Sequence, residues 1–120
     1  ILTIRFTQEE VMEFQTTEHK RCTVIKTSGR IDGSTAPELE KALKEITDKG
    51  VYHIVFDMAE VNFVSSRGWW ALIGTQKVCK PRGELVLVSV EKLIRESLNL
   101  VGMDTYFKIY DDVTTAVGSF

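Results

Sequence analysis

The chain of 120 residues is 43% hydrophobic and 27% charged, a balance that is typical of one globular domain with a hydrophobic core. Its formal net charge of −2 gives no general attraction to nucleic acid or to anionic lipid, so neither is an expected partner. No apolar run approaches the roughly 20 residues of a membrane span, and no signal-peptide pattern opens the chain, so we expect a cytoplasmic protein.

Predicted strands and helices alternate along the chain. Apolar runs bounded by turn residues predict strands, and apolar residues at helical spacing between start and stop signals predict helices. In chain order we expect one or two edge strands within 1–19, a strand over 22–28, a helix over 35–49, a strand over 51–57, a helix over 67–79, a strand over 85–90, a helix over 91–101, a strand over 106–110 and a short helix over 111–120. We expect a single domain over 1–120, with residues 1–12 as a candidate N-terminal extension.

The helix over 35–49 carries the clearest signals. Thr35 and Glu38 have the spacing of a capping box, and Pro37 lies in the first turn, where its missing N–H does no harm. Gly50 follows the last turn as the stop. The apolar residues of this helix fall on one stripe, which consists of Leu39, Ala42, Leu43 and Ile46.

This order predicts an α/β fold, a small, largely parallel mixed sheet flanked by helices. Strands 22–28 and 51–57, joined by a helix, are expected to be parallel neighbours whose carboxyl ends share one edge of the sheet. Residues 51–57 are apolar almost throughout, as in a strand covered on both faces. The loops RIDGS (30–34) and VSSRG (64–68) should therefore meet at that edge, where sites of open α/β sheets gather.

Cysteine and histidine give no sign of a metal site. Cys22 and Cys79 lie far apart, without a second cysteine or a histidine at ligand spacing, so we expect two buried free thiols and no metal or other cofactor. His53 lies inside an apolar strand, which favours a satisfied core histidine over a ligand.

Three stretches resemble, in order and spacing, the STAS domains of the anti-sigma factor antagonist family. They are KTSGRIDGSTAPELEKAL, IVFDMAEVNFVSSRGWWALI and LNLVGMDTYFKIYDD, and the likeness runs from residue 13 to the C-terminus. The resemblance implies a small mixed sheet flanked by helices. It also implies partner switching: the unmodified antagonist binds an anti-sigma factor and frees the sigma factor. A serine kinase, often the anti-sigma factor itself, ends that binding by phosphorylation, which a phosphatase would reverse.

The family's usual motif is Asp-Ser-x-Gly-Leu, and this chain departs from it. The phosphoacceptor position falls on Ser66 and the glycine on Gly68. Ser65 stands where the Asp is usual and Trp69 where the Leu is usual, while Trp70 replaces a small residue. An Asp at this position helps a kinase to orient the acceptor hydroxyl, and Ser65 cannot carry that charge. Which serine is modified, if either, therefore stays open, with Ser65 as the alternative acceptor to Ser66.

Two interpretations of the paired serines stay open. A serine at a helix start satisfies backbone N–H groups, so a purely capping role is the alternative to modification. A phosphate adds about −1.5 to −2 charge at a helix start, where the dipole and the N–H groups tolerate it, so it would alter the surface more than the fold. Arg67 places a cation beside the acceptor, which would partly neutralise a phosphate.

The two tryptophans separate by their angle on the helix. At about 100° per residue, Trp69 points with Cys79 toward the sheet, whereas Trp70 falls near Lys77 on the outer face. Trp70 either packs beneath a neighbouring loop or contacts a partner, because Trp is enriched at binding hot spots. Asp32 is either a cap or turn residue or part of the shared edge. The candidate partner-binding residues are Asp32, Gly33, Ser34, Ser65, Arg67, Trp70 and Lys77.

Enzyme functions find little support. Ser66 with His19 or His53 would be a hydrolase pair, but the G-x-S-x-G motif is absent, as are a phosphate-cradling loop and a dinucleotide-binding turn. We therefore expect a binding protein and not an enzyme, with a protein partner such as an anti-sigma factor that is also a serine kinase. The alternative is a non-switching STAS module that docks on a transporter or a signalling scaffold through the same edge.

Overall fold

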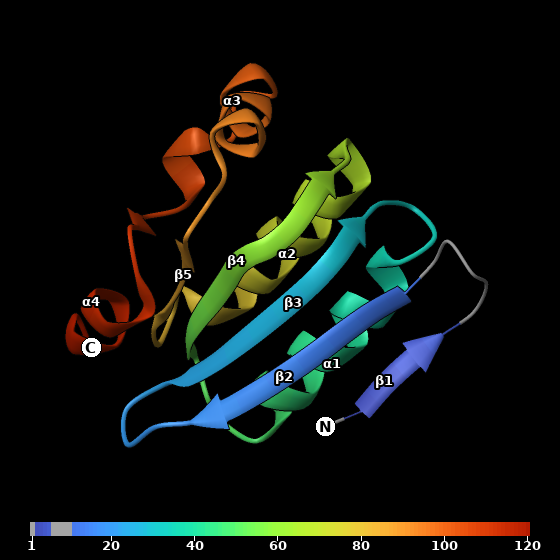
Figure 1. Ribbon diagram of the computed structural model, residues 1–120. Coiled ribbons are helices and arrows are strands. Elements are labelled where there is room, and N and C mark those ends of the chain that lie inside the picture. Colours follow the sequence, from blue (N-terminus) through green and yellow to red (C-terminus); the bar gives the residue numbers. More distant parts are fainter. Residues whose placement is uncertain (1, 6–10) are drawn as a thin grey trace.

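The computed structural model describes residues 2–5 and 11–120, with side-chain environments from Met12 onward. The strands are β1 (Leu2–Arg5), β2 (Val11–Glu18), β3 (Thr23–Ile31), β4 (His53–Val64), β5 (Glu84–Val88) and β6 (Ile109–Tyr110). The helices are α1 (Ala36–Asp48), α2 (Ser66–Cys79), α3 (Lys92–Leu100) and α4 (Val113–Gly118), with a 3-10 turn over Asp104–Tyr106. The strands form one sheet in chain order, antiparallel from β1 to β3 and parallel from β3 to β6 (Figure 1). The predicted α/β fold is confirmed.

Helices α1, α2 and α3 pack on one face of this sheet, whereas α4 packs on part of the other face at β4 to β6, and β4 shows the division. Its alternate residues point to opposite faces. Ile54 and Phe56 belong to the larger core cluster, which also holds buried apolar residues of α1, α2 and α3 such as Leu43, Trp69 and Leu98. Val55 belongs to a second cluster with Ala116 of α4. The prediction that β4 is covered on both faces is therefore confirmed. In Figure 1, α1 and α2 lie together behind the sheet.

The strands that carry the shared edge are longer than the sequence pattern predicted. β3 does not end at Gly29 but continues to Ile31, and β4 continues from residue 57 to Val64. Gly29 has a φ of 102° beside a shift in the β3–β4 register. A glycine adopts this positive φ without strain, so Gly29 allows an irregularity within the strand instead of ending it. The expected loop before α2 shrinks to Ser65.

Several local predictions need correction. The capping box at α1 is wrong, because the Thr35 side chain makes no cap hydrogen bond. The strand over 106–110 is reduced to β6, because its first residue ends the 3-10 turn. β5 ends two residues before the predicted boundary, where Ser89 adopts a φ of 56°.

The remaining predictions fare better. The helices are confirmed to within two residues at each end, and both cysteines are buried and free. Two strands occupy the N-terminal region, although residues 1 and 6–10 lie outside the described residues. His53 is half-buried against the ring of Phe120, with 4.6 Å between the ring centroids. Its buried Nδ1 has no hydrogen-bond partner in the part of the chain that the structure describes, so it is not a satisfied core histidine there. Within the described ranges, no helix is both long and apolar enough to cross a membrane.

Candidate functional site

The carboxyl ends of β3 and β4 lie side by side, as their parallel pairing requires. In the register of the two strands Ile31 is paired with Val64, and the backbone N–H of Ser65 donates to the carbonyl oxygen of Ile31 at 2.8 Å. Asp32, which follows β3, and Ser65, which follows β4, are therefore neighbours at the end of the sheet. The predicted meeting of the two loops at one sheet edge is confirmed.

Asp32 organises the turn between β3 and α1. Its Oδ1 accepts from the Ser34 hydroxyl at 2.7 Å, from the Ser34 N–H at 3.0 Å and from the Thr35 N–H at 3.3 Å. The hydroxyl of Ser34 is the main reason that the pKa of Asp32 is lowered. Both interpretations of Asp32 hold together: it is a turn residue, and it lies at the shared edge. Gly33 and Ser34 are exposed beside it.

The two serines at the start of α2 have different surroundings. Ser65 is the N-cap, and its half-buried Oγ accepts from the N–H of Gly68 at 3.2 Å. Ser66 is the first helical residue and is exposed, and its hydroxyl has no hydrogen-bond partner among the described residues. Ser65 therefore caps the helix, whereas the hydroxyl of Ser66 is accessible to solvent and forms no hydrogen bond with the described residues.

Gly68 lets α2 begin close to β3. A Cβ atom at this position would lie 2.7 Å from the carbonyl oxygen of Ile31 and 3.0 Å from a methyl carbon of Val64. No side chain fits in that space without a shift of the helix or the strands. The glycine two residues after Ser66 therefore has a packing reason that holds whether or not the serine is modified.

Arg67 does not stand as an unpaired cation beside Ser66. Its guanidinium group donates to both carboxylate oxygens of Glu40 on α1, at 2.9 and 3.2 Å. These bonds raise the pKa of Arg67, and they connect α1 to α2 at the surface. A phosphate on Ser66 would have to compete with Glu40 for this cation, which corrects the expectation that Arg67 is available for it.

The tryptophans occupy the environments that their helical angles predicted. Trp69 is fully buried, and its Nε1 donates to the hydroxyl of Ser97 on α3 at 3.3 Å. Trp70 is 55% exposed, and Lys77 is exposed on the same side of α2. Val78, about two turns after Trp70, is 52% exposed, so α2 presents two exposed apolar side chains with Lys77 between them in the chain.

Some residues of this region could not be found from the sequence. Glu40 and Ser97 lie on other helices, and no pattern indicates which of their polar residues meets α2. Arg30 lies over the ring of Phe63 at 4.3 Å, a cation–π contact next to the edge. The β3–β4 register shifts twice between the Lys26–Asp57 pair and the Arg30–Phe63 pair, so even the full length of β4 would not have indicated this contact.

The hydrolase pair is not formed in the described structure. His53 begins β4 and Ser66 follows its far end, so the length of a 12-residue strand separates them. Within the described ranges, no group of three or more histidine, cysteine or acidic residues is arranged to hold a metal ion.

Comparisons with known proteins agree with this architecture. A family model described as the STAS domain matches residues 13–116. The anti-sigma-F factor antagonist RsfB of Mycobacterium tuberculosis is 26% identical over 100 residues, which cover 83% of this chain and 82% of that protein. The anti-sigma-B factor antagonist of Staphylococcus aureus is 26% identical over 93 residues, which cover 77% and 86%.

Solved structures extend the likeness. An anti-sigma factor antagonist from Mycobacterium paratuberculosis superposes with a TM-score of 0.84 at 25% identity, covering 94% of this chain and 96% of that one. The unphosphorylated antagonist SpoIIAA gives 0.75 at 18% identity, covering 89% and 95%, a likeness of fold alone. The chain therefore belongs to the STAS domain family, and the anti-sigma factor antagonists among its relatives are binding proteins, not enzymes.

Proposed function

We propose that this protein is an anti-sigma factor antagonist that acts in a phosphorylation-controlled partner switch. Unphosphorylated, it binds an anti-sigma factor; phosphorylation of Ser66 by a serine kinase, which is the anti-sigma factor itself or a separate protein, ends the binding. A phosphatase restores it. The observation that carries this proposal is the difference between the two serines. Ser65 caps α2, whereas the hydroxyl of Ser66 is exposed and has no hydrogen-bond partner among the described residues.

The position of Ser66 explains how a phosphate can act as a switch without unfolding the protein. The start of a helix tolerates negative charge, because the dipole and the first N–H groups favour it. A partner packed on the same edge would have to desolvate a group of about −1.5 to −2 charge. Phosphorylation therefore weakens binding more than it changes stability.

The proposed partner surface has contacting residues and supporting residues. The exposed residues, which can touch a partner directly, are Gly33, Ser34, Ser66, Arg67, Trp70 and Lys77. Asp32 and Ser65 are partly buried and hold the backbone of the turn and the helix start through their hydrogen bonds. Trp70 is the central apolar contact in this proposal, because exposed Trp is the residue type most enriched at binding hot spots.

The experiment that tests the switch is phosphorylation by the cognate kinase, read by intact mass. We expect one phosphate on the parent protein and on Ser65→Ala, and none on Ser66→Ala. Ser66→Asp should weaken binding to the anti-sigma factor, whereas Ser66→Ala should keep it. If the Ser65→Ala, Ser66→Ala double variant is still phosphorylated, or the parent never is, the switch at this site is wrong.

The second candidate is a static docking module. The same fold occurs in two chains from transporter families. A sulfate transporter family protein of Wolinella succinogenes gives a TM-score of 0.68 at 20% identity, covering 80% of this chain and 81% of that one, and a part of murine Slc26a9 gives 0.71 at 17% identity, covering 86% of this chain and 18% of that one. Such a module would use the same edge without modification. Intact mass of the protein from its own cells separates the two functions, because only the switch predicts a phosphorylated fraction. The switch also implies a cytoplasmic location, where sigma factors act.

A further inference from the structure

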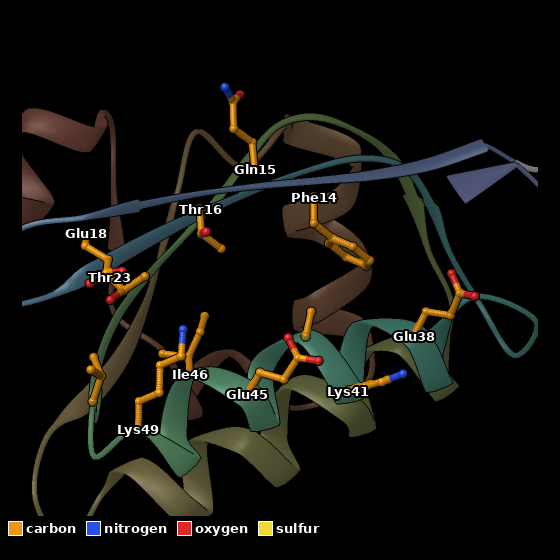
Figure 2. Close-up of a pocket in the computed structure, with 12 residues that line it drawn as sticks. Phe14, Gln15, Thr16, Glu18, Thr23, Glu38, Lys41, Glu45, Ile46 and Lys49 are labelled. Atoms are coloured by element: carbon orange, nitrogen blue, oxygen red, sulfur yellow. The ribbon is translucent and has the colours of Figure 1, made fainter. Parts of the chain in front are cut away.

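A groove of about 590 Å³ lies between β2 and α1, and neither Glu40 nor Arg67 lines it (Figure 2). This volume falls within the range of about 300–1,000 Å³ that is typical of small-molecule sites. Its apolar lining consists of Phe14, Ala42, Ile46 and Val51, all packed against the main core. The groove is separate from the serine edge and has no part in the proposed function.

Charged side chains surround this apolar lining, with one negative charge in excess. The carboxylates belong to Glu18, Glu38 and Glu45, and the ammonium groups to Lys41 and Lys49. None of these five side chains forms an ion pair with any residue in the described part of the chain. The excess charge suits a monovalent cation.

Glu38 has a carboxylate oxygen that lacks a partner. Its Oε2 is shielded from solvent and accepts no hydrogen bond from the residues that the structure describes. A carboxylate oxygen can only accept hydrogen bonds. A carboxylate oxygen that is shielded from water and has no donor is therefore an unsatisfied acceptor, which an N–H or O–H group of a ligand could satisfy. A second shielded oxygen, Oγ1 of Thr27, also has no partner in residues 2–5 and 11–120, and Thr27 is the β3 residue that is paired with Phe14.

The ring of Phe14 completes the arrangement. In Figure 2 it projects from β2 toward α1, while the carboxylates of Glu38 and Glu45 extend from α1 toward the sheet. An aromatic face attracts a cation, and a carboxylate forms a charge-assisted hydrogen bond with an ammonium group. From Glu38 to Ile46 the helix rises about 12 Å, which leaves room for an apolar body behind such a group.

We propose that this groove binds an organic cation that consists of a primary ammonium group on an apolar body. The ammonium group donates to Glu38 beside the ring of Phe14, and the apolar body lies on Ala42, Ile46 and Val51. A carboxylate-bearing amphiphile of the same length is disfavoured, because it would meet the shielded oxygen of Glu38 with like charge.

The test is a titration of the full chain with n-octylamine, followed by backbone amide chemical shifts. We expect shifts in β2 and α1, and at least about tenfold weaker binding of n-octanol and n-octanoate. Glu38→Gln keeps the shape of the side chain but removes the charge, and should weaken n-octylamine binding about tenfold. Phe14→Leu should weaken it about fivefold. Glu96→Gln, at an exposed position of α3, is the matched control and should bind like the parent.

Three results would overturn the proposal: no shifts in the groove at the solubility limit of n-octylamine, binding of n-octanoate as tight as that of n-octylamine, or unchanged affinity of Glu38→Gln. If Phe14→Leu does not fold, Glu38→Gln decides alone, because the Glu38 side chain forms no ion pair with the described residues and its shielded Oε2 accepts no hydrogen bond from them.

Discussion

Gly68 and Ile31 set the distance between α2 and the end of β3, since a Cβ atom at Gly68 would lie 2.7 Å from the carbonyl oxygen of Ile31 and 2.8 Å from its Cγ2 atom. We expect Gly68→Ala to lower the free energy of unfolding by about 1–3 kcal/mol, because the helix start must move away from a packed strand.

Gly74 provides the matched control on the same helix. A Cβ atom there would meet nothing within 4 Å, so Gly74→Ala should raise the free energy of unfolding by about 0.5–1 kcal/mol through helix propensity alone. Urea unfolding of both variants measures the difference. Equal effects at the two glycines would contradict the close approach seen at Gly68.

The serines make a second pair for comparison. Ser65→Ala removes the side-chain acceptor of the Gly68 N–H and should cost about 0.5–2 kcal/mol of stability. Ser66→Ala removes an exposed hydroxyl without a partner, so its stability should stay within about 0.5 kcal/mol of the parent. Thermal unfolding without kinase checks both. A larger loss of stability in Ser66→Ala than in Ser65→Ala would contradict the assignment of the cap to Ser65.

The sequence predicted the elements of this fold better than their ends. Helical periodicity placed α1 and α2, and the apolar run at 51–57 placed β4, because burial of apolar side chains dominates these patterns. The ends depend on partners that are distant in the chain. β4 continues over exposed residues such as Asn62 because β3 supplies hydrogen bonds up to Ile31, and no local pattern shows that.

The same limit applies to the candidate site. The shared edge and the opposite exposures of Trp69 and Trp70 follow from topology and helical angle, which the sequence carries. Thr35 is the N-cap residue of α1, but its hydroxyl accepts from the backbone N–H of Asp32 and donates to the carbonyl oxygen of Arg30, so the predicted capping box does not form. Only the bend of the chain brings these groups together, and no local pattern shows it. The pairing of Arg67 with Glu40 depends on how two helices pack, which single-residue patterns do not contain.

The tryptophans should differ in what their removal costs. Trp69→Ala should lower the free energy of unfolding by about 3–5 kcal/mol, because the side chain is fully buried. Trp70→Ala should change stability by no more than about 0.5 kcal/mol, because more than half of its surface is in solvent. In the proposed function, Trp70→Ala also weakens binding to the anti-sigma factor by about 2 kcal/mol or more, measurable by calorimetry. Unchanged binding would remove Trp70 from the partner surface.

The Arg67–Glu40 pair should contribute little to stability despite its two hydrogen bonds. Both side chains are nearly half-exposed, so water and salt screen the attraction. A double-mutant cycle with Arg67→Gln and Glu40→Gln should give a coupling free energy of about 0.2–1 kcal/mol that falls as salt is added. A coupling that is larger and independent of salt would show that the pair is a structural lock between α1 and α2.

The turn held by Asp32 should make stability depend on acid. Because hydrogen bonds from Ser34, first its hydroxyl, lower the pKa of Asp32 below the ordinary 3.8, the folded state holds the charged form more strongly than the unfolded chain does. This contribution is complete above pH 3.8 and is lost as the pH falls through the lower folded-state pKa.

Asp32→Asn keeps an acceptor in the turn but cannot titrate, so its free energy of unfolding should fall less steeply than that of the parent as the pH drops below 3.8. Asp112, whose pKa is lowered mainly by the backbone N–H of Thr115 at the start of α4, titrates in the same window and remains in this variant. Asp112→Asn therefore serves as the parallel control, and the double variant should show the shallowest acid dependence. Urea unfolding across this pH range gives the slopes. Identical slopes for Asp32→Asn and the parent would mean that the turn does not hold the carboxylate in its charged form.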